Sequence, residues 1–381
     1  MSYAEVTSHQ SMVYDARRNA AYVRALEQLV TPDTVVLDIG AGLGVLGLFA
    51  ARLGAKHVYL VEPEPVIEVA RQAARDSGLD NVTCLRARVE EVQEDIQADV
   101  LISVFTGNLL FGEDLLPSLF YARDRFLKPG GTLLPDTARI LVRPASAPAV
   151  YQDKVETWAR YGDFCADNQL PAIDYSAARP YAANTLLYDV GGDKQPVTPL
   201  APAAELMVLD LARADRAGGK ASVSVQAGQS GTQHGWQGWF AMRLLDEWYD
   251  TSRAAGPTHW SEVFLPLAEP LSLQQGDTID FTLSRPEYGE WSWITSHQGS
   301  SQRQSSFLSL PLKPADLMKR AEAYQPRLGE KGRAVAWALQ HMDGSRSSAE
   351  LAQAITRQYP GAFATEREAL QFMRALAQQF G

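Results

Sequence analysis

The sequence of 381 residues contains only two cysteines, Cys84 and Cys165, and their spacing does not match a metal site. We therefore expect free thiols, no bound metal and a reducing, cytoplasmic environment. No stretch reaches the roughly 18 apolar residues of a membrane span, and the first residues lack the pattern of a signal peptide. The net charge of −10 argues against a nucleic-acid-binding surface. These absences predict a protein with neither membrane nor nucleic-acid partners.

The stretch from Val35 to Glu62 has the order strand, glycine turn, helix, strand. Val35 to Leu37 is an apolar run typical of a buried parallel strand, and the turn that follows reads Asp38-Ile39-Gly40-Ala41-Gly42-Leu43-Gly44. His57 to Val61 forms the second strand, with Glu62 at its C-terminal end. Because ligands bind at this edge of a parallel α/β sheet, the stretch predicts a nucleotide-like ligand.

Two cofactors and a purely structural turn compete for this glycine turn. Gly42 to Gly47 fits the dinucleotide pattern G-x-G-x-x-G, with Glu62 placed to hold a ribose hydroxyl. However, an acidic residue followed by G-x-G-x-G, here Asp38 to Gly44, resembles motif I of class I S-adenosylmethionine-dependent methyltransferases. That ligand has no pyrophosphate and carries positive charge, so an acidic residue beside the turn favours it over a nicotinamide cofactor.

The length and the order of elements predict several domains. Strands alternate with helices as far as residue 135, which indicates a Rossmann-like parallel α/β domain. Residues 136–312 contain short β-type runs separated by turns, typical of an antiparallel β domain, with a helical insertion from Tyr151 to Phe164. Residues 315–323, 332–342, 347–359 and 366–380 are expected to form helices.

With this domain order, residues 2–312 resemble the protein arginine methyltransferase family. Ser2-Tyr3-Ala4, His9, Met12, Asp15 and Arg18 have the spacing of its N-terminal lid helix. The resemblance implies that Met12 packs at the sulfonium of S-adenosylmethionine, Arg18 binds its carboxylate, Glu62 its ribose, and Val89-Glu90 its adenine. The implied cofactor site comprises Met12, Arg18, Asp38, Gly40, Gly42, Gly44, Glu62, Val89 and Glu90.

The resemblance extends to the β domain. Thr258-His259-Trp260 matches the family's THW loop, so we expect His259 to pair with Asp15 and Trp260 to contact the substrate. The family implies a β-barrel and a homodimer formed through an arm, here at about residues 151–190. The expected domains are a lid helix at 1–30, the cofactor-binding domain at 31–135, the barrel with its arm at 136–312, and a helical domain at 313–381.

The sequence departs from the family in its double-E loop, where two glutamates grip the substrate guanidinium. The loop reads Ser103-Val104-Phe105-Thr106-Gly107-Asn108 and continues to Glu113, so only the second carboxylate is present. Two carboxylates orient a guanidinium and offset its desolvation, and removing one partner of a buried ion network costs about 3 to 5 kcal/mol. We expect Glu113 to orient the acceptor nitrogen, with Val104 and Asn108 lining its site.

Three explanations for Val104 remain open: a less basic acceptor such as imidazole or amide, another acid in place of the missing one, or loss of catalysis. The candidate replacements are Asp114 and Glu290, and His297 is a candidate base. The main prediction is N-methyl transfer to a peptide, protein or amino acid, and a catalytically silent binding protein is the alternative. The tail after Met342 weakly resembles winged-helix domains that recognise precursor peptides in peptide natural-product biosynthesis, although a plain helical packing module is equally compatible.

Overall fold

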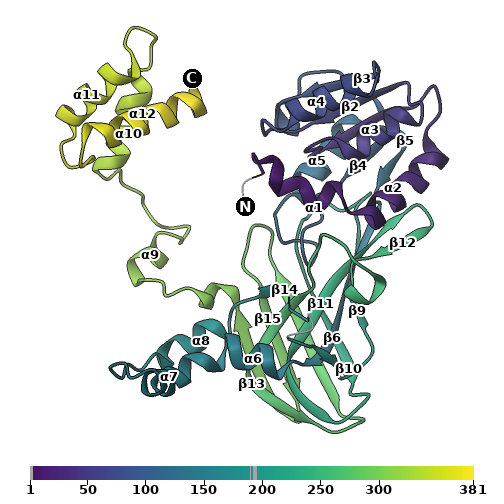
Figure 1. The fold of residues 1–381 in the computed structure, drawn as a ribbon, viewed down its shortest axis with the longest axis vertical. Coiled ribbons are helices and arrows are strands. Elements are labelled where there is room, and N and C mark those ends of the chain that lie inside the picture. The colour runs from purple at the N-terminus through teal and green to yellow at the C-terminus, as the bar shows by residue number, and fades with distance from the viewer. Residues whose placement is uncertain (1–2, 189, 192–194) are drawn as a thin grey trace. The chain divides into compact units, whose positions relative to one another are not determined.

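The computed structural model describes residues 3–188, 190–191 and 195–381. The chain divides into two compact units, 1–311 and 312–381, each with its own hydrophobic core (Figure 1). Ser2 and Asp189, which belong to the expected lid and arm, lie outside the described residues. Within the described part of the chain, no helix is both long enough and apolar enough to cross a bilayer.

The first described residues form short helical segments rather than the single lid helix expected within residues 1–30. These are η1 (Val6–His9), α1 (Gln10–Val13) and α2 (Ala16–Leu29). The break lies at Asp15, whose side chain accepts a hydrogen bond from the backbone N–H of Arg18 and so caps α2. An aspartate that satisfies a free N–H group favours the start of a helix over its interior.

A five-stranded parallel sheet follows, in the order β3-β2-β1-β4-β5. Its strands are β1 (Val35–Ile39), β2 (His57–Val61), β3 (Val82–Leu85), β4 (Ala98–Ser103) and β5 (Leu127–Leu134). The intervening helices are α3 (Val45–Arg52), α4 (Ile67–Asp76), the short η2 (Val89–Glu91) and α5 (Leu116–Phe126). Residues 128–131, a Lys-Pro-Gly-Gly stretch typical of a turn, are instead part of β5, which pairs irregularly with β4. The central position of β1 places the glycine turn in the middle of the sheet's C-terminal edge.

Two antiparallel sheets form the second half of the first unit. One has the order β10-β14-β15-β16, formed by β10 (Gly219–Gln226), β14 (Thr278–Arg285), β15 (Ser292–His297) and β16 (Ser300–Ser305). The other has the order β7-β13-β11-β6-β8, formed by β7 (Leu187–Tyr188), β13 (Val263–Leu273), β11 (Gly231–Leu244), β6 (Thr137–Ser146) and β8 (Thr198–Pro199). Two further strands extend it, β9 (Ala204–Asp210) on β6 and β12 (Glu247–Asp250) on β11. Because β9 lies beside β10 and β13 beside β16, the sheets close into the expected barrel.

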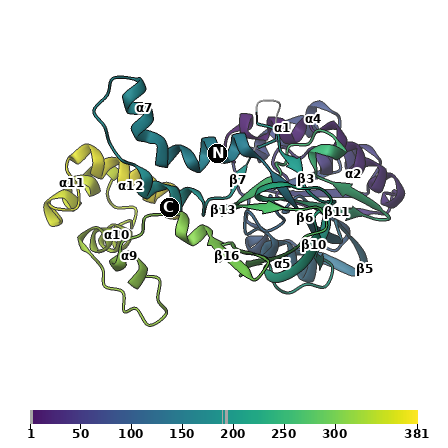
Figure 2. The same cartoon turned by 90° about the horizontal axis from the view of Figure 1, so that it is seen from below.

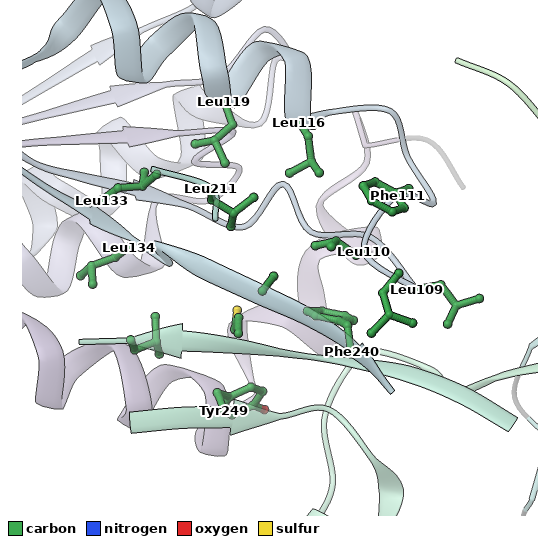
Figure 3. Close-up of a cluster of buried hydrophobic side chains, with 14 of the residues drawn as sticks. Leu109, Leu110, Phe111, Leu116, Leu119, Leu133, Leu134, Leu211, Phe240 and Tyr249 are labelled. Carbon is green, nitrogen blue, oxygen red and sulfur yellow. The ribbon is translucent and has the colours of Figure 1, made fainter. Parts of the chain in front are cut away.

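The parallel sheet and the barrel share one apolar core. Figure 3 shows Leu109, Leu110 and Phe111 lying between the α5 side chains and Phe240 of the barrel. These residues belong to the loop between β4 and α5, so the barrel packs directly against the loop that carries Glu113. The position of that loop therefore depends on both halves of the unit.

A helical arm extends from the barrel where the insertion was expected (Figures 1 and 2). It contains α6 (Pro148–Lys154), η3 (Glu156–Arg160), α7 (Tyr161–Asp167), η4 (Ser176–Ala178) and α8 (Arg179–Ala182). Several large apolar side chains on it are exposed, including Trp158, Phe164, Leu170, Ile173 and Tyr175.

The second unit is helical, as expected. It contains α9 (Pro314–Met318), α10 (Glu330–Gln340), α11 (Ser348–Gln358) and α12 (Glu366–Phe380). Ser347 and Glu350 form a reciprocal capping box at the start of α11. Residues 312–381, all of which are described, contain no strand, so the wing of a winged helix is absent. Helix α9 is also shorter than the expected helix over 315–323.

Candidate active site

The glycine turn after β1 has a conformation that side chains would obstruct. Gly40, Gly42 and Gly44 have φ angles of 62°, 54° and 76°, in the left-handed region that glycine adopts without strain. A Cβ on Gly42 would lie 2.7 Å from Nδ1 of His9, and one on Gly40 would lie 2.1 Å from the ring of Phe105. The start of the chain and the loop after β4 therefore approach the turn closely, and the site forms where these segments meet.

Two buried carboxylates stand beside this turn. Asp38 accepts a hydrogen bond from the N–H of Gly47 at 2.9 Å, and Glu62 accepts one from the N–H of Gly42 at 2.9 Å. Burial raises the pKa of Asp38 to about 7, although the Gly47 bond and the charge of Arg18 oppose that rise. A cation placed beside Asp38 would favour its ionised form, so the turn suits a ligand with a positive group.

The remaining expected cofactor residues surround this edge of the sheet. Arg18 is 2% exposed, and its Nη2 donates to the carbonyl of Met12 at 2.7 Å. Val89 is buried in η2, and the neighbouring carboxylate of Glu90 accepts a hydrogen bond from the hydroxyl of Ser118 on α5. The protein thus offers a guanidinium that can donate to a ligand carboxylate and acids that can accept from ligand amino and hydroxyl groups. This set of groups fits S-adenosylmethionine.

His259 and Asp15 lie together, as the sequence suggested. The Nδ1 of His259 is 2.8 Å from Oδ2 of Asp15, and the same oxygen accepts bonds from the His259 N–H and the Thr258 hydroxyl, each at 2.9 Å. Burial alone would raise the pKa of Asp15, but the hydrogen bonds from His259, Arg18 and Thr258 outweigh it and hold that pKa below its usual range. Burial lowers the pKa of His259, so the neutral imidazole donates to an ionised carboxylate. The barrel loop thus holds the residue that caps the lid helix α2.

The same barrel loop also holds the loop between β4 and α5. The Nε1 of Trp260 donates to the carbonyl of Thr106 at 2.9 Å, and the N–H of Ser261 donates to the side-chain oxygen of Asn108 at 3.0 Å. Trp260 and Asn108, both expected at the acceptor site, therefore connect the barrel loop to the loop that carries Glu113.

The Glu113 carboxylate contacts the start of the chain. The Tyr3 hydroxyl lies 3.1 Å from each of its oxygens. Burial, followed by the charge and hydrogen bond of Glu113, raises the pKa of Tyr3 to about 12, so this phenol is a donor at neutral pH. Tyr3 also offers its carbonyl oxygen to Nε2 of His9 at 2.8 Å. One segment thus contacts both the glycine turn and Glu113.

The candidate replacements for the missing carboxylate are engaged elsewhere. Val104 is half-buried against the apolar core, and Asp114 forms an ion pair with Arg285, with 2.7 Å between Oδ2 and Nη2. Glu290 is exposed and accepts a hydrogen bond from Ser306, and His297 pairs with Asp277 at 3.1 Å. Of the aromatics around Glu290, Trp291 and Trp293 are buried in the core, whereas Tyr288 is exposed. Asp114, Glu290 and His297 therefore do not supply the missing acid or a base in this arrangement.

Three residues at the site received no role from the sequence. Tyr3 was part of the lid pattern, and its aromatic hydroxyl was the available signal. Phe105 follows Val104 directly and could have been found from its place in the loop. Arg285 occupies the inward side of β14, where the alternation of Ile279, Phe281 and Leu283 predicts an apolar residue; a charge there was the overlooked signal.

Known proteins resemble this chain in sequence and in structure. The family model described as "Methyltransferase domain" matches residues 36–131. Protein arginine N-methyltransferase 1.1 of Arabidopsis thaliana is 30% identical over 293 residues, which cover 74% of this chain and 72% of that protein. Protein arginine N-methyltransferase 6 of Xenopus laevis is 30% identical over 299 residues, covering 74% and 85% respectively. The structure of the Trypanosoma brucei PRMT1 enzyme-prozyme heterotetrameric complex with AdoHcy has a TM-score of 0.71 and 26% identity, covering 80% of this chain and 99% of that one.

Proposed function

The chain belongs to the protein arginine N-methyltransferase family, and from this premise we propose that it methylates a side-chain nitrogen of a peptide or protein. The observation that carries the proposal is the position of Glu113. Its carboxylate is held by Tyr3, and the segment that contains Tyr3 also lies against the glycine turn through His9. The same N-terminal segment therefore contacts both the acid proposed for the acceptor and the turn proposed for the methyl donor.

S-adenosylmethionine, when bound, supplies a methyl group already activated by its sulfonium. In our proposal Arg18 binds the donor's carboxylate, Met12 packs at its sulfonium, Glu62 holds its ribose and Glu90 its adenine. Asp38 and the three turn glycines form the surface against which the methyl donor lies. Asp15 and His259 hold the lid over this site, because their hydrogen bonds join α2 to the barrel.

Glu113 orients the acceptor in this proposal. Its carboxylate accepts a hydrogen bond from the acceptor's N–H group, and the proton that leaves the nitrogen passes to Glu113 or to water. Transfer requires a free lone pair on the nitrogen and alignment of nitrogen, methyl carbon and sulfur. Val104, Asn108 and Trp260 border the acceptor and limit its approach.

A nitrogen less basic than a guanidinium is a second candidate acceptor, favoured by the environment of Val104 and Asp114. Val104 contributes no charge, and the charge of Asp114 is balanced by Arg285. A site with one unbalanced carboxylate suits a neutral nucleophile such as imidazole better than a cation that requires two carboxylates.

The helical arm is relevant to how the chain assembles. The exposed apolar side chains of the arm would be covered in a homodimer, which we propose as the functional state.

The helical tail contains an open surface pocket of about 180 Å³ lined by Met342, Gly344, Arg346, Ser348, Leu351, Met373 and Ala377. We propose that this unit binds a segment of the peptide substrate and raises its local concentration at the site.

The proposal is tested by incubating the chain with labelled S-adenosylmethionine and three peptides that differ only at a central arginine, histidine or glutamine. Mass spectrometry then locates the label. Methylation of the arginine peptide supports the family's activity, and preference for the histidine peptide supports the weakly basic acceptor. Cofactor binding in calorimetry without label transfer to any protein or peptide in a cell extract would contradict the proposal.

A further inference from the structure

Arg285 on β14 connects the barrel to the residue that follows Glu113. Its Nη2 lies 2.7 Å from Oδ2 of Asp114. We infer that Arg285 is a positioning residue, which fixes the Glu113 carboxylate at the acceptor site by holding Asp114. The inference rests on the proposed function, because it assigns Glu113 to the acceptor nitrogen.

The ion pair is poorly suited to a purely stabilising role. Arg285 is 5% exposed, and its Nε and Nη1, like Oδ1 of Asp114, are enclosed without a hydrogen-bond partner. Unpaired buried donors and acceptors carry a desolvation cost, and apolar residues of similar size often stabilise such a position better. The pair therefore calls for an explanation other than overall stability, and fixing a local geometry is the best-supported one.

The backbone beside Glu113 has a conformation that needs such a constraint. Asp114 has a φ angle of 55°, and Leu109 and Leu110 in the same loop have φ angles of 51° and 68°. Residues other than glycine are uncommon in this region; aspartate enters it more readily than leucine does, and tertiary contacts help to hold both there. Without the ion pair we expect Asp114 to relax to negative φ. Because Glu113 directly precedes Asp114, that relaxation would redirect its carboxylate.

The surroundings of Arg285 include the loop that carries Glu113. Its guanidinium carbon is 5.5 Å from the centre of the Trp291 ring, which is 6.2 Å from the ring of Phe111 in the Glu113 loop. Burial raises the pKa of Tyr188, while the Arg285 charge opposes and the Glu113 charge reinforces this rise. The charges of Arg285 and Glu113 thus both act on this phenol, although the two residues lie on different elements.

The test compares the full chain with Arg285→Met, Arg285→Lys, Asp114→Asn and the double variant Arg285→Met with Asp114→Asn. Arg243→Met is the matched control, because it removes another barrel arginine paired with an aspartate, Asp136, at 2.8 Å. For each protein we would measure kcat and KM with the best peptide of the label assay, the Kd of S-adenosylmethionine, and the position of Glu113 in a crystal structure.

Arg285→Met and Asp114→Asn are each expected to lower kcat/KM at least 30-fold, with the cofactor Kd changed less than threefold. The double variant is expected to be no worse than either single variant, and Arg285→Lys to recover part of the loss. Arg243→Met is expected to change kcat/KM less than threefold. Additive losses, or a cofactor Kd that weakens in parallel with activity, would overturn the inference.

The crystal structure separates this inference from the proposed function. Should wild type methylate no peptide, the proposed function fails, and the positioning role is then decided by whether Glu113 leaves the Tyr3 hydroxyl in Arg285→Met. If Arg285→Met does not fold, Asp114→Asn, which removes the charge of the other partner of the same ion pair, provides the comparison. A Glu113 carboxylate that stays within hydrogen-bond distance of Tyr3 in the variant overturns the positioning role whatever the activity.

Discussion

The Nδ1 atom of His259 lies 2.8 Å from Oδ2 of Asp15, although 244 positions separate the two residues in the chain. Asp15 also caps α2, which carries Arg18 in its first turn. One carboxylate thus connects the barrel with the helix proposed to bind the cofactor.

Asp15→Asn is expected to weaken S-adenosylmethionine binding about 10-fold and to lower the free energy of unfolding by about 1 to 3 kcal/mol, because an amide cannot accept all the bonds that the carboxylate accepts. Calorimetry and urea unfolding would measure the two effects. The exposed Asp33→Asn serves as control and should change neither. Unchanged cofactor affinity in Asp15→Asn would argue against the lid connection.

Glu113→Gln is expected to reduce turnover at least 100-fold, since the amide cannot take up a proton or balance charge at the acceptor. Cofactor affinity should stay within threefold of wild type. The label assay and calorimetry supply the two measurements, with the exposed Glu94→Gln as control. Turnover equal to wild type would remove Glu113 from its proposed role.

Val104→Glu would restore the second carboxylate of the family's loop. Because a buried guanidinium that lacks one of its partners carries a cost of about 3 to 5 kcal/mol, supplying that partner should raise kcat/KM for the arginine peptide 10-fold or more. Val104→Gln is the matched neutral control. Equal activity of the glutamate and glutamine variants would show that the missing charge does not limit arginine methylation.

Asp38 should make the stability of the cofactor-free chain depend on pH. Its pKa is raised by burial to about 7, so between about pH 4 and 7 the folded chain holds a proton that the unfolded chain has lost. Stability must then fall as pH rises through this window, by roughly 2 to 3 kcal/mol between pH 5 and 8.

The measurement is urea unfolding at those two pH values for wild type and Asp38→Asn. The variant lacks the titrating group, so its stability should fall less across the same interval. Asp80→Asn, which changes an exposed aspartate, should follow wild type. Parallel curves for wild type and Asp38→Asn would contradict the raised pKa.

Replacing Trp158 and Phe164 of the arm by glutamate should convert the proposed homodimer to a monomer, because a dimer interface would bury two charges without partners. Sedimentation velocity would measure the change in mass. Val208→Glu, at another exposed apolar position on the barrel, should leave the mass unchanged. A wild-type chain that sediments as a monomer at micromolar concentration would refute the dimer.

The parallel sheet, the antiparallel strands and the helical tail could be anticipated because their signals are local, whereas the closure of those strands into a barrel was implied by the family resemblance. Glycines beside an acid at the end of an apolar run indicate a turn at a sheet edge, and short runs separated by turn residues indicate antiparallel strands. The contact between Asp15 and His259 could be expected only because both matched a family pattern. Periodicity alone gives no information about contacts so distant in sequence.

The partners of Asp114 and Glu290 could not be found in the same way. Whether an acid faces a site depends on which cation the tertiary fold places beside it, and Arg285 reaches Asp114 from a strand 171 positions later. The break before α2 was missed for a different reason. The apolar spacing of residues 8–30 continues through Asp15, and only the capping bond reveals where the helix restarts.

The separate core of residues 312–381 has a consequence for how such a chain can evolve. Its buried residues, among them Ala334, Ile355 and Met373, pack within the helical unit itself. Substitutions there leave the packing beneath the cofactor turn unaltered, so a lineage can exchange or diversify this unit while the catalytic half is inherited intact. If the tail binds the peptide substrate as proposed, selection for a new peptide can act on it without passing through variants that have lost methyl transfer.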